Sequence, residues 1–149
     1  MSQHSTTPDQ LCFATAARKA SRRLTQIYDV ALQPCGLRST QYAILNELAR
    51  HRDDTLTMME IASLLVLDRS AFGHNVRPLE RDGYVAMVEG TDDRRRKYVA
   101  LTELGAEKYL EARALWKVAQ KQIAKVIGKS RSEDIRSALL AIAHSGQLG

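Results

Sequence analysis

The fold is decided by residues Thr57–Thr102, TMMEIASLLVLDRSAFGHNVRPLERDGYVAMVEGTDDRRRKYVALT. Thr57 and Glu60 have the spacing of a capping box, and they stand just before an apolar run, so a helix is expected to begin there. Leu67-Asp68 interrupts this helix, and Asp68 is a favoured N-cap residue for the next one. Gly83 is the residue type that ends a helix in the left-handed conformation. The stretch therefore begins as a short helix, a sharp turn and a second helix.

Two runs rich in β-branched and aromatic residues follow, Tyr84–Val88 and Lys97–Leu101, and such runs are typical of strands. The segment between them, Glu89–Arg96, is polar and holds three acids and three arginines. A helix-turn-helix unit lays its second helix in the major groove of DNA, and arginines at the tip of a following ribbon suit a narrow minor groove. The alternative is that the helices are only core elements and the arginines are only solvated.

Four further helices are predicted around this stretch. Their expected bounds are Asp9 to about Leu32, Ser39 to about Arg50, Glu103–Ile127, and a last helix that begins with a capping box of Ser130 and Glu133. Thr102 is expected to cap the third of these helices and Gly128 to end it. The terminal helices are more apolar than one winged domain can cover, so a second copy of the chain is expected to cover them.

The composition excludes several classes of protein. Lys and Arg total 22 against 17 acids, and the formal charge of +5 modestly favours a nucleic-acid partner. No apolar run approaches the ~18 residues of a membrane span, and Met1–Ser5 lacks the apolar core of a signal peptide, so a cytoplasmic protein without membrane association is expected. The four histidines and two cysteines lack metal-ligand spacing, and no phosphate loop is present. No metal, no cofactor and no enzymatic activity are therefore expected.

The chain resembles the MarR family of winged-helix regulators in four motifs: LDRS (67–70), LERDGYV (79–85), DRR (93–95) and VALTELG (99–105). The resemblance covers most of the chain. It implies a homodimer that binds a pseudo-palindromic operator in double-stranded DNA, often as a repressor that a small ligand or an oxidant releases. It also implies that Leu56 adds a third short strand to the ribbon.

The expected fold class is mainly α with a small β wing, a winged helix-turn-helix domain with long N- and C-terminal dimerisation helices. Residues 1–36 are expected to form an N-terminal dimerisation arm, 37–102 the DNA-binding domain and 103–149 the C-terminal dimerisation helices. The expected function is that of a homodimeric, sequence-specific transcriptional regulator, a repressor released by a small aromatic or anionic ligand. Two alternatives stay open: a regulator switched by peroxide or thiols through Cys12, and a winged-helix module that binds protein or RNA.

The first turns of the second helix of the helix-turn-helix are expected to face the groove. Arginine suits a phosphate or a guanine edge, serine a phosphate, and histidine or asparagine either. The candidate residues are Arg69, Ser70, Phe72, Gly73, His74, Asn75 and Arg77. For Phe72 the alternative is that it packs inside.

This second helix departs from the family pattern at two places. Gly73-His74 stands where relatives usually carry Thr or Ser and then Arg, and Pro78 lies in mid-helix. Because proline removes one backbone hydrogen bond and clashes one turn back, a kink between His74 and Pro78 is expected. Because of this departure, the base contacts that the family resemblance implies do not transfer directly to this helix.

All three arginines of the wing, Arg94, Arg95 and Arg96, are candidate DNA contacts. Asp93 and Arg95 are expected to pair and to hold the tip, while Arg94 or Arg96 enters the minor groove. An exposed pair of this kind is worth under ~1 kcal/mol, so its role would be orientation. The planar, weakly hydrated head of arginine suits the minor groove.

Leu11-Cys12-Phe13-Ala14 resembles the segment that carries the reactive cysteine in the peroxide-sensing OhrR branch of the family. A helix N-terminus favours the thiolate, which is the oxidisable form of cysteine. The tyrosines expected to hold that thiolate do not match, since Ala16 stands four residues on and Tyr28 comes two residues late. The alternative is that Cys12 is a small buried hydrophobic residue.

The first helix also carries a basic cluster, which consists of Arg18, Lys19, Arg22 and Arg23. The cluster is expected to be solvated. Two alternatives are contact with a DNA phosphate and pairing with the carboxylate of an aromatic effector. Such an effector is expected in the crevices where dimer arms meet winged domains.

Overall fold

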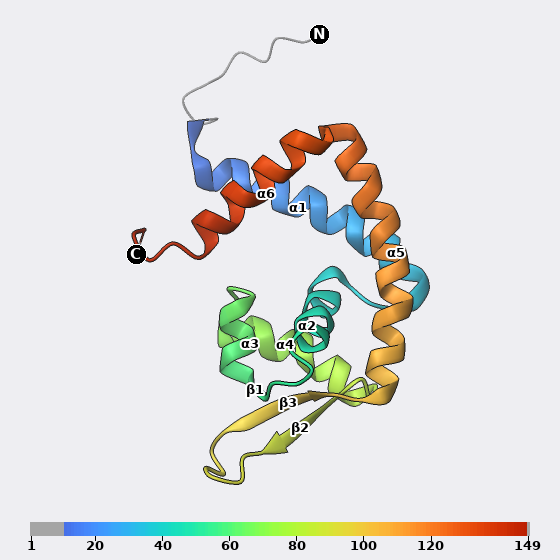
Figure 1. Cartoon of the computed structure of the whole chain (residues 1–149), viewed down its shortest axis with the longest axis vertical. Coiled ribbons are helices and arrows are strands. Elements are labelled where there is room, and N and C mark those ends of the chain that lie inside the picture. Colours follow the sequence, from blue (N-terminus) through green and yellow to red (C-terminus); the bar gives the residue numbers. More distant parts are fainter. Residues whose placement is uncertain (1–10, 149) are drawn as a thin grey trace.

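The computed structural model describes residues 11–148. Its elements are α1 (Phe13–Leu32), the 3-10 helix η2 (Gln33–Cys35), α2 (Ser39–Arg50), β1 (Leu56–Thr57), α3 (Met58–Leu64), α4 (Arg69–Arg81), β2 (Val85–Glu89), β3 (Lys97–Leu101), α5 (Glu103–Ile127) and α6 (Lys129–Ala143), all labelled in Figure 1 except η2. The mainly α fold with a small β wing is confirmed. Among the described residues, no helix is both long and apolar enough to cross a membrane.

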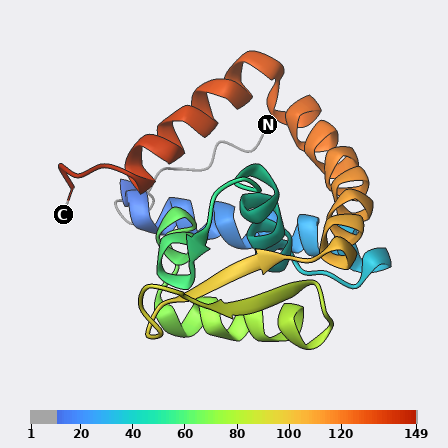
Figure 2. The same ribbon diagram turned by 60° about the horizontal axis from the view of Figure 1, so that its bottom comes forward.

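The elements form a winged lobe and an arm (Figure 1). The lobe contains α2, α3, α4 and the sheet, while α1, α5 and α6 extend away from it. The turned view in Figure 2 shows that α5 leaves one end of the sheet and that α6 then runs back at an angle to it. No residue of α6 is buried within the chain, so its apolar side chains remain on the surface.

The core lies where α2 and α4 meet the sheet. Tyr42, Leu45 and Leu48 of α2 face inward and are buried. On α4 the buried residues are Phe72, Val76 and Leu79, which share one helical face. Because this face is fixed by packing, the orientation of the opposite face of α4 is fixed as well.

Side-chain caps define the helix-turn-helix. The capping box is present: Thr57 N–H donates to Glu60 Oε2 at 2.8 Å, and Glu60 N–H donates to Thr57 Oγ1 at 3.1 Å. Asp68 Oδ1 accepts from the N–H of Ala71 at 2.7 Å and begins α4. Both caps agree with the sequence prediction.

The turn between α3 and α4 has a feature that the sequence did not indicate. Val66 adopts a φ of 54°, the one positive φ of a non-glycine residue among residues 11–148. The N–H of Leu67 donates to the carbonyl of Ala62 at 2.8 Å, which closes the end of α3. A left-handed conformation costs a side-chain-bearing residue about 1–2 kcal/mol, and the surrounding turn maintains it here.

The wing is a three-stranded antiparallel sheet in the order β1-β3-β2. Leu56 pairs with Val99, so the third short strand is confirmed. The hairpin of β2 and β3 runs in register from Val85 opposite Leu101 to Glu89 opposite Lys97.

The first turn of α5 is tied to the start of β2. Thr102 caps α5, since its Oγ1 accepts from the N–H of Gly105 at 2.9 Å, and its hydroxyl lies 2.6 Å from the carbonyl oxygen of Gly83, to which it donates. A Cβ atom at Gly105 would lie 1.9 Å from the carbonyl oxygen of Tyr84. Only glycine permits this approach, so α5 sits directly on the end of the wing.

One predicted helix start is wrong, and another lies outside the described residues. The first helix begins at Phe13, with Cys12 at the N-cap, and the predicted start at Asp9 lies outside the described residues. The capping box of Ser130 and Glu133 is absent, because Gly128 reverses the chain in one residue and α6 begins at once. Helix α4 continues as one helix through Pro78.

Candidate nucleic-acid interface

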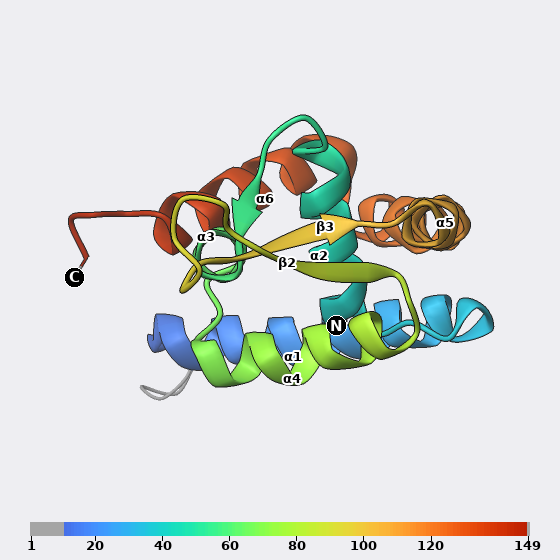
Figure 3. The same cartoon turned by 90° about the horizontal axis from the view of Figure 1, so that it is seen from below.

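The outward face of α4 carries a row of polar residues. At about 100° per residue, the positions opposite the buried face are those of Ser70, His74, Arg77 and Arg81, and all four are exposed. We call these four residues the outward stripe. Helix α4 lies at the outside of the lobe in Figures 2 and 3, so the stripe is open to a partner.

The structure separates the predicted contacts on α4 into two groups. Arg69, Ser70, His74 and Arg77 are exposed and Gly73 is half-buried, so all five lie on an accessible surface. Phe72 is only 2% exposed and packs in the core, so its expected contact with DNA is wrong. Asn75 is half-buried, and its side-chain amide donates to the carbonyl of Ala71 at 2.8 Å, so this side chain is bonded to the backbone of its own helix.

Arg81 is an addition to the predicted set. Its Nε lies 3.3 Å from Asp82 Oδ1, and the pair is on the surface. The spacing of His74, Arg77 and Arg81 along one helical face was the signal that would have found it.

Backbone hydrogen bonds hold the tip of the wing. Asp93 Oδ1 accepts from the backbone N–H of Arg95 at 2.9 Å, and the carbonyl of Asp93 accepts from the N–H of Arg96 at 3.0 Å. The expected pair of the Asp93 and Arg95 side chains is therefore wrong, because the loop places the backbone N–H of Arg95 at the carboxylate. No ion pair among residues 11–148 includes Arg94, Arg95 or Arg96.

The wing tip and the N-terminal end of α4 lie at the same end of the lobe. Strand β2 follows α4 and runs back beside it, so the loop between β2 and β3 returns to the level of the first turns of α4 (Figures 2 and 3). One surface thus carries a polar helix face and three exposed arginines.

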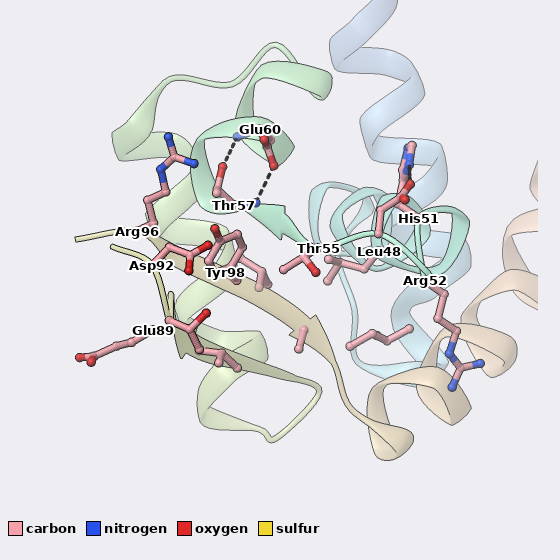
Figure 4. A pocket seen from close by; sticks show the side chains of 16 residues that line it. Leu48, His51, Arg52, Thr55, Thr57, Glu60, Glu89, Asp92, Arg96 and Tyr98 are labelled. Carbon is pink, nitrogen blue, oxygen red and sulfur yellow. Dashed lines mark hydrogen bonds and ion pairs between the residues drawn. The ribbon is translucent and has the colours of Figure 1, made fainter. Parts of the chain in front are cut away.

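A cleft of about 740 Å³ lies between the wing and the loop that joins α2 to β1. Figure 4 shows Arg96, Asp92 and Tyr98 on one side of it and Thr55 and Arg52 on the other. Its charged lining mixes acids with arginines. None of the four basic residues of α1 lines this cleft.

Aromatic side chains join the lobe to the arm. Tyr42 of α2 stacks on Tyr109 and Trp116 of α5, with ring centroids 5.8 and 5.7 Å apart. The hydroxyl of Tyr109 donates to Asn46 Oδ1 at 2.9 Å. Burial raises the pKa of Tyr42 well above its usual range, so this phenol stays neutral and forms part of the packed junction.

The two cysteines lie in different environments. Cys35 is buried, and its thiol donates to the carbonyl of Leu32 at 3.0 Å. Cys12 is exposed within the single chain. Hydrogen bonds from Thr15 and Ala14 lower the pKa of the Cys12 thiol. In the same helix, Arg18, Lys19, Arg22 and Arg23 are exposed, as expected for solvated side chains.

Comparison with known proteins agrees with this geometry. The model of the MarR family matches residues 36–96. The M. tuberculosis transcriptional regulator MosR, solved in complex with DNA, is 30% identical to this chain with a TM-score of 0.73, and the match covers 89% of this chain and 97% of MosR. The chain belongs to the MarR family.

Other regulators share the MarR-family fold of this chain. The transcriptional repressor CouR, bound to a 23-mer DNA duplex, is 22% identical with a TM-score of 0.82, over 96% of this chain and 100% of CouR. CouR from Rhodococcus jostii RHA1, bound to p-coumaroyl-CoA, is 23% identical with a TM-score of 0.78, over 91% of this chain and 94% of that one. No curated protein matches the sequence. MosR, CouR and a MarR-family protein from Rhodococcus sp. RHA1 are all described as transcriptional regulators or repressors.

Proposed function

We propose that this MarR-family protein is a cytoplasmic homodimeric repressor that binds a pseudo-palindromic operator in double-stranded DNA. Helix α4 lies in the major groove with Arg69 and the outward stripe toward the bases, and the wing arginines lie in the adjacent minor groove. The observation that carries the proposal is the common surface formed by the outward stripe and the wing tip. MosR and CouR were each solved with DNA, which supports it.

The dimer is proposed from the apolar surface of the arm. Residues 103–149, together with residues 1–36, serve as the dimerisation region, and residues 37–102 as the DNA-binding domain. The exposed apolar side chains on the described part of the arm include Phe13, Val30, Val118, Val126, Ile135, Leu139, Leu140 and Ile142. So many exposed apolar side chains on one arm indicate a surface that a partner covers. A second arm of the same kind would also place two α4 helices about one DNA turn apart.

The wing tests the proposal. Replacing Arg94 and Arg95 by Ala is expected to weaken binding to all duplexes and to flatten its salt dependence. Each lost phosphate contact reduces the magnitude of the negative slope of log K against log salt by ~0.9. The tip itself should persist, because Asp93 binds the backbone N–H of Arg95 and not its side chain. Fluorescence anisotropy over a salt series measures the slope.

A charge-matched control is Lys117→Ala with Lys121→Ala, which removes two positive charges from the exposed side of α5. This control should leave the slope nearly unchanged. If the wing variant and the wild type have equal salt slopes, the wing does not contact DNA. Equal affinity for operator and random duplex would argue against a sequence-specific regulator and favour a protein- or RNA-binding module.

We further propose that a small aromatic or anionic ligand releases the protein from DNA. The support is CouR, a repressor by its description, which was also solved with p-coumaroyl-CoA. A panel of phenolic acids and their coenzyme A thioesters is expected to contain a compound that raises the melting temperature and lowers operator affinity. Because a ligand that binds only the folded state stabilises it, a panel without any thermal shift contradicts an effector of this class.

An oxidant-responsive regulator is the second candidate, and the environment of Cys12 favours it. The exposed thiol stands at the N-cap of α1, and its lowered pKa increases the reactive thiolate near neutral pH. Alkylation of Cys12 is expected to reach its plateau at a lower pH than that of a free cysteine. Buried Cys35 should react slowly in the same sample.

The functional test compares wild type with Cys12→Ser after mild treatment with an organic peroxide. The expected result is that only the wild type loses its operator. If both proteins lose it equally, or if the wild type retains it, Cys12 is not a switch.

A further inference from the structure

Gly73 leaves space beside the outward stripe of α4, and the Arg77 side chain occupies it. A Cβ atom built on Gly73 would meet one atom outside the helix backbone within 4 Å, Nη2 of Arg77 at 3.8 Å. Side chains on a helix lean toward its N-terminus. The guanidinium of Arg77 therefore lies against the backbone of Gly73, one turn closer to the start of α4 than its own Cα.

Within the described residues, no ion pair holds the Arg77 guanidinium away from a ligand. Among residues 11–148, no ion pair includes Arg77, whereas Arg81 on the same stripe is paired with Asp82. The side chain is exposed, while the adjacent Val76 is 1% exposed and anchors this turn in the core. The core thus holds the backbone near Arg77 in place, while the Arg77 guanidinium is exposed to a partner.

We propose that Gly73 is a positioning residue, whose missing side chain lets the Arg77 guanidinium lie beside it and read a guanine in each half-site. The inference rests on the proposed function. Helices in the major groove contact bases with their N-terminal residues, so an arginine in the third turn must reach back to join them. Arginine is the side chain that pairs with N7 and O6 of guanine through two hydrogen bonds.

The size of the side chain at position 73 decides whether Arg77 can lie there. Alanine adds only the Cβ atom, whose 3.8 Å distance to Nη2 is an ordinary contact. Valine adds two γ carbons beside that Cβ, in the space next to the guanidinium, and it offers no hydrogen bond of its own to DNA. Gly73→Ala and Gly73→Val are therefore a matched pair.

Binding-site selection from a duplex pool with a randomised half-site tests the proposal. The wild type is expected to prefer guanine at one position by about tenfold or more, the discrimination typical of a good bidentate pair. Arg77→Ala and Gly73→Val should both lose this preference at the same position, and Gly73→Ala should keep it. Arg77→Lys should lose it too, while retaining the salt dependence, because lysine keeps the charge but not the planar fork.

The outcomes separate two failures. If the wild type binds no duplex selectively, the proposed function itself fails. If the wild type selects an operator but Gly73→Val keeps the guanine preference, or if Arg77→Lys does, the positioning role is overturned. Thermal unfolding identifies a variant that does not fold. If Gly73→Val is such a variant, Gly73→Leu, a better helix former that also fills the space beside the guanidinium, takes its place in the comparison.

Discussion

Leu139→Glu is expected to convert the dimer to a monomer and to weaken operator binding by about 100-fold or more, because a monomer loses the effective concentration of its second half-site. Leu139 is 45% exposed within the chain, on a helix with no buried residue. A charge there costs the isolated chain little, whereas in a dimer it would be buried without a partner. Sedimentation velocity and operator anisotropy measure the two effects.

Ser137→Glu is the matched control, since Ser137 is exposed on α6 two residues away and points to another side of the helix. This variant should remain dimeric and keep its operator affinity. A dimeric Leu139→Glu protein would show that α6 is not at the interface.

Phe72→Ala is expected to lower the free energy of unfolding by about 3–5 kcal/mol, the usual range for removing a buried aromatic ring. Phe72 is among the largest fully buried side chains of the described chain. Phe72→Leu keeps more of the volume and should cost much less. Urea unfolding at one fixed protein concentration measures both, because the stability of a dimer depends on concentration.

Operator affinity provides the contrast for this position. Phe72→Leu should retain it, since the side chain does not reach the surface. If a Phe72 variant kept wild-type stability but no longer bound the operator, Phe72 would instead be a DNA contact.

Much of the fold was predictable because its signals are local. Thr57, Asp68 and Thr102 are N-caps whose hydrogen bonds involve residues three positions away. Gly83 adopts a φ of 80° just after α4, as its position in the sequence indicated. Interactions of this range depend little on the rest of the chain, so a sequence pattern captures them.

The features that the sequence did not predict depend on which of several possible partners or conformations the folded chain selects. The Asp93 carboxylate accepts from the backbone N–H of Arg95 and does not pair with its guanidinium, and the two residue types alone do not decide between these partners. Val66 carries no residue-type signal for a left-handed turn. The inward orientation of Phe72 follows from the shared face with Val76 and Leu79, a pattern present in the sequence that a motif-based assignment passes over.

The contact of Gly105 with the carbonyl of Tyr84 has a mechanical consequence. With Thr102 bonded to Gly83 as well, the hairpin and α5 are expected to move together. Strand β3 and the loop beyond it extend roughly 25 Å at ~3.3 Å per residue. A rotation of α5 by about 5° would therefore displace the tip by about 2 Å, more than the distance tolerance of a hydrogen bond. In the proposed dimer, a small change in the angle between the two arms would thus be enough to withdraw both sets of wing arginines from the DNA.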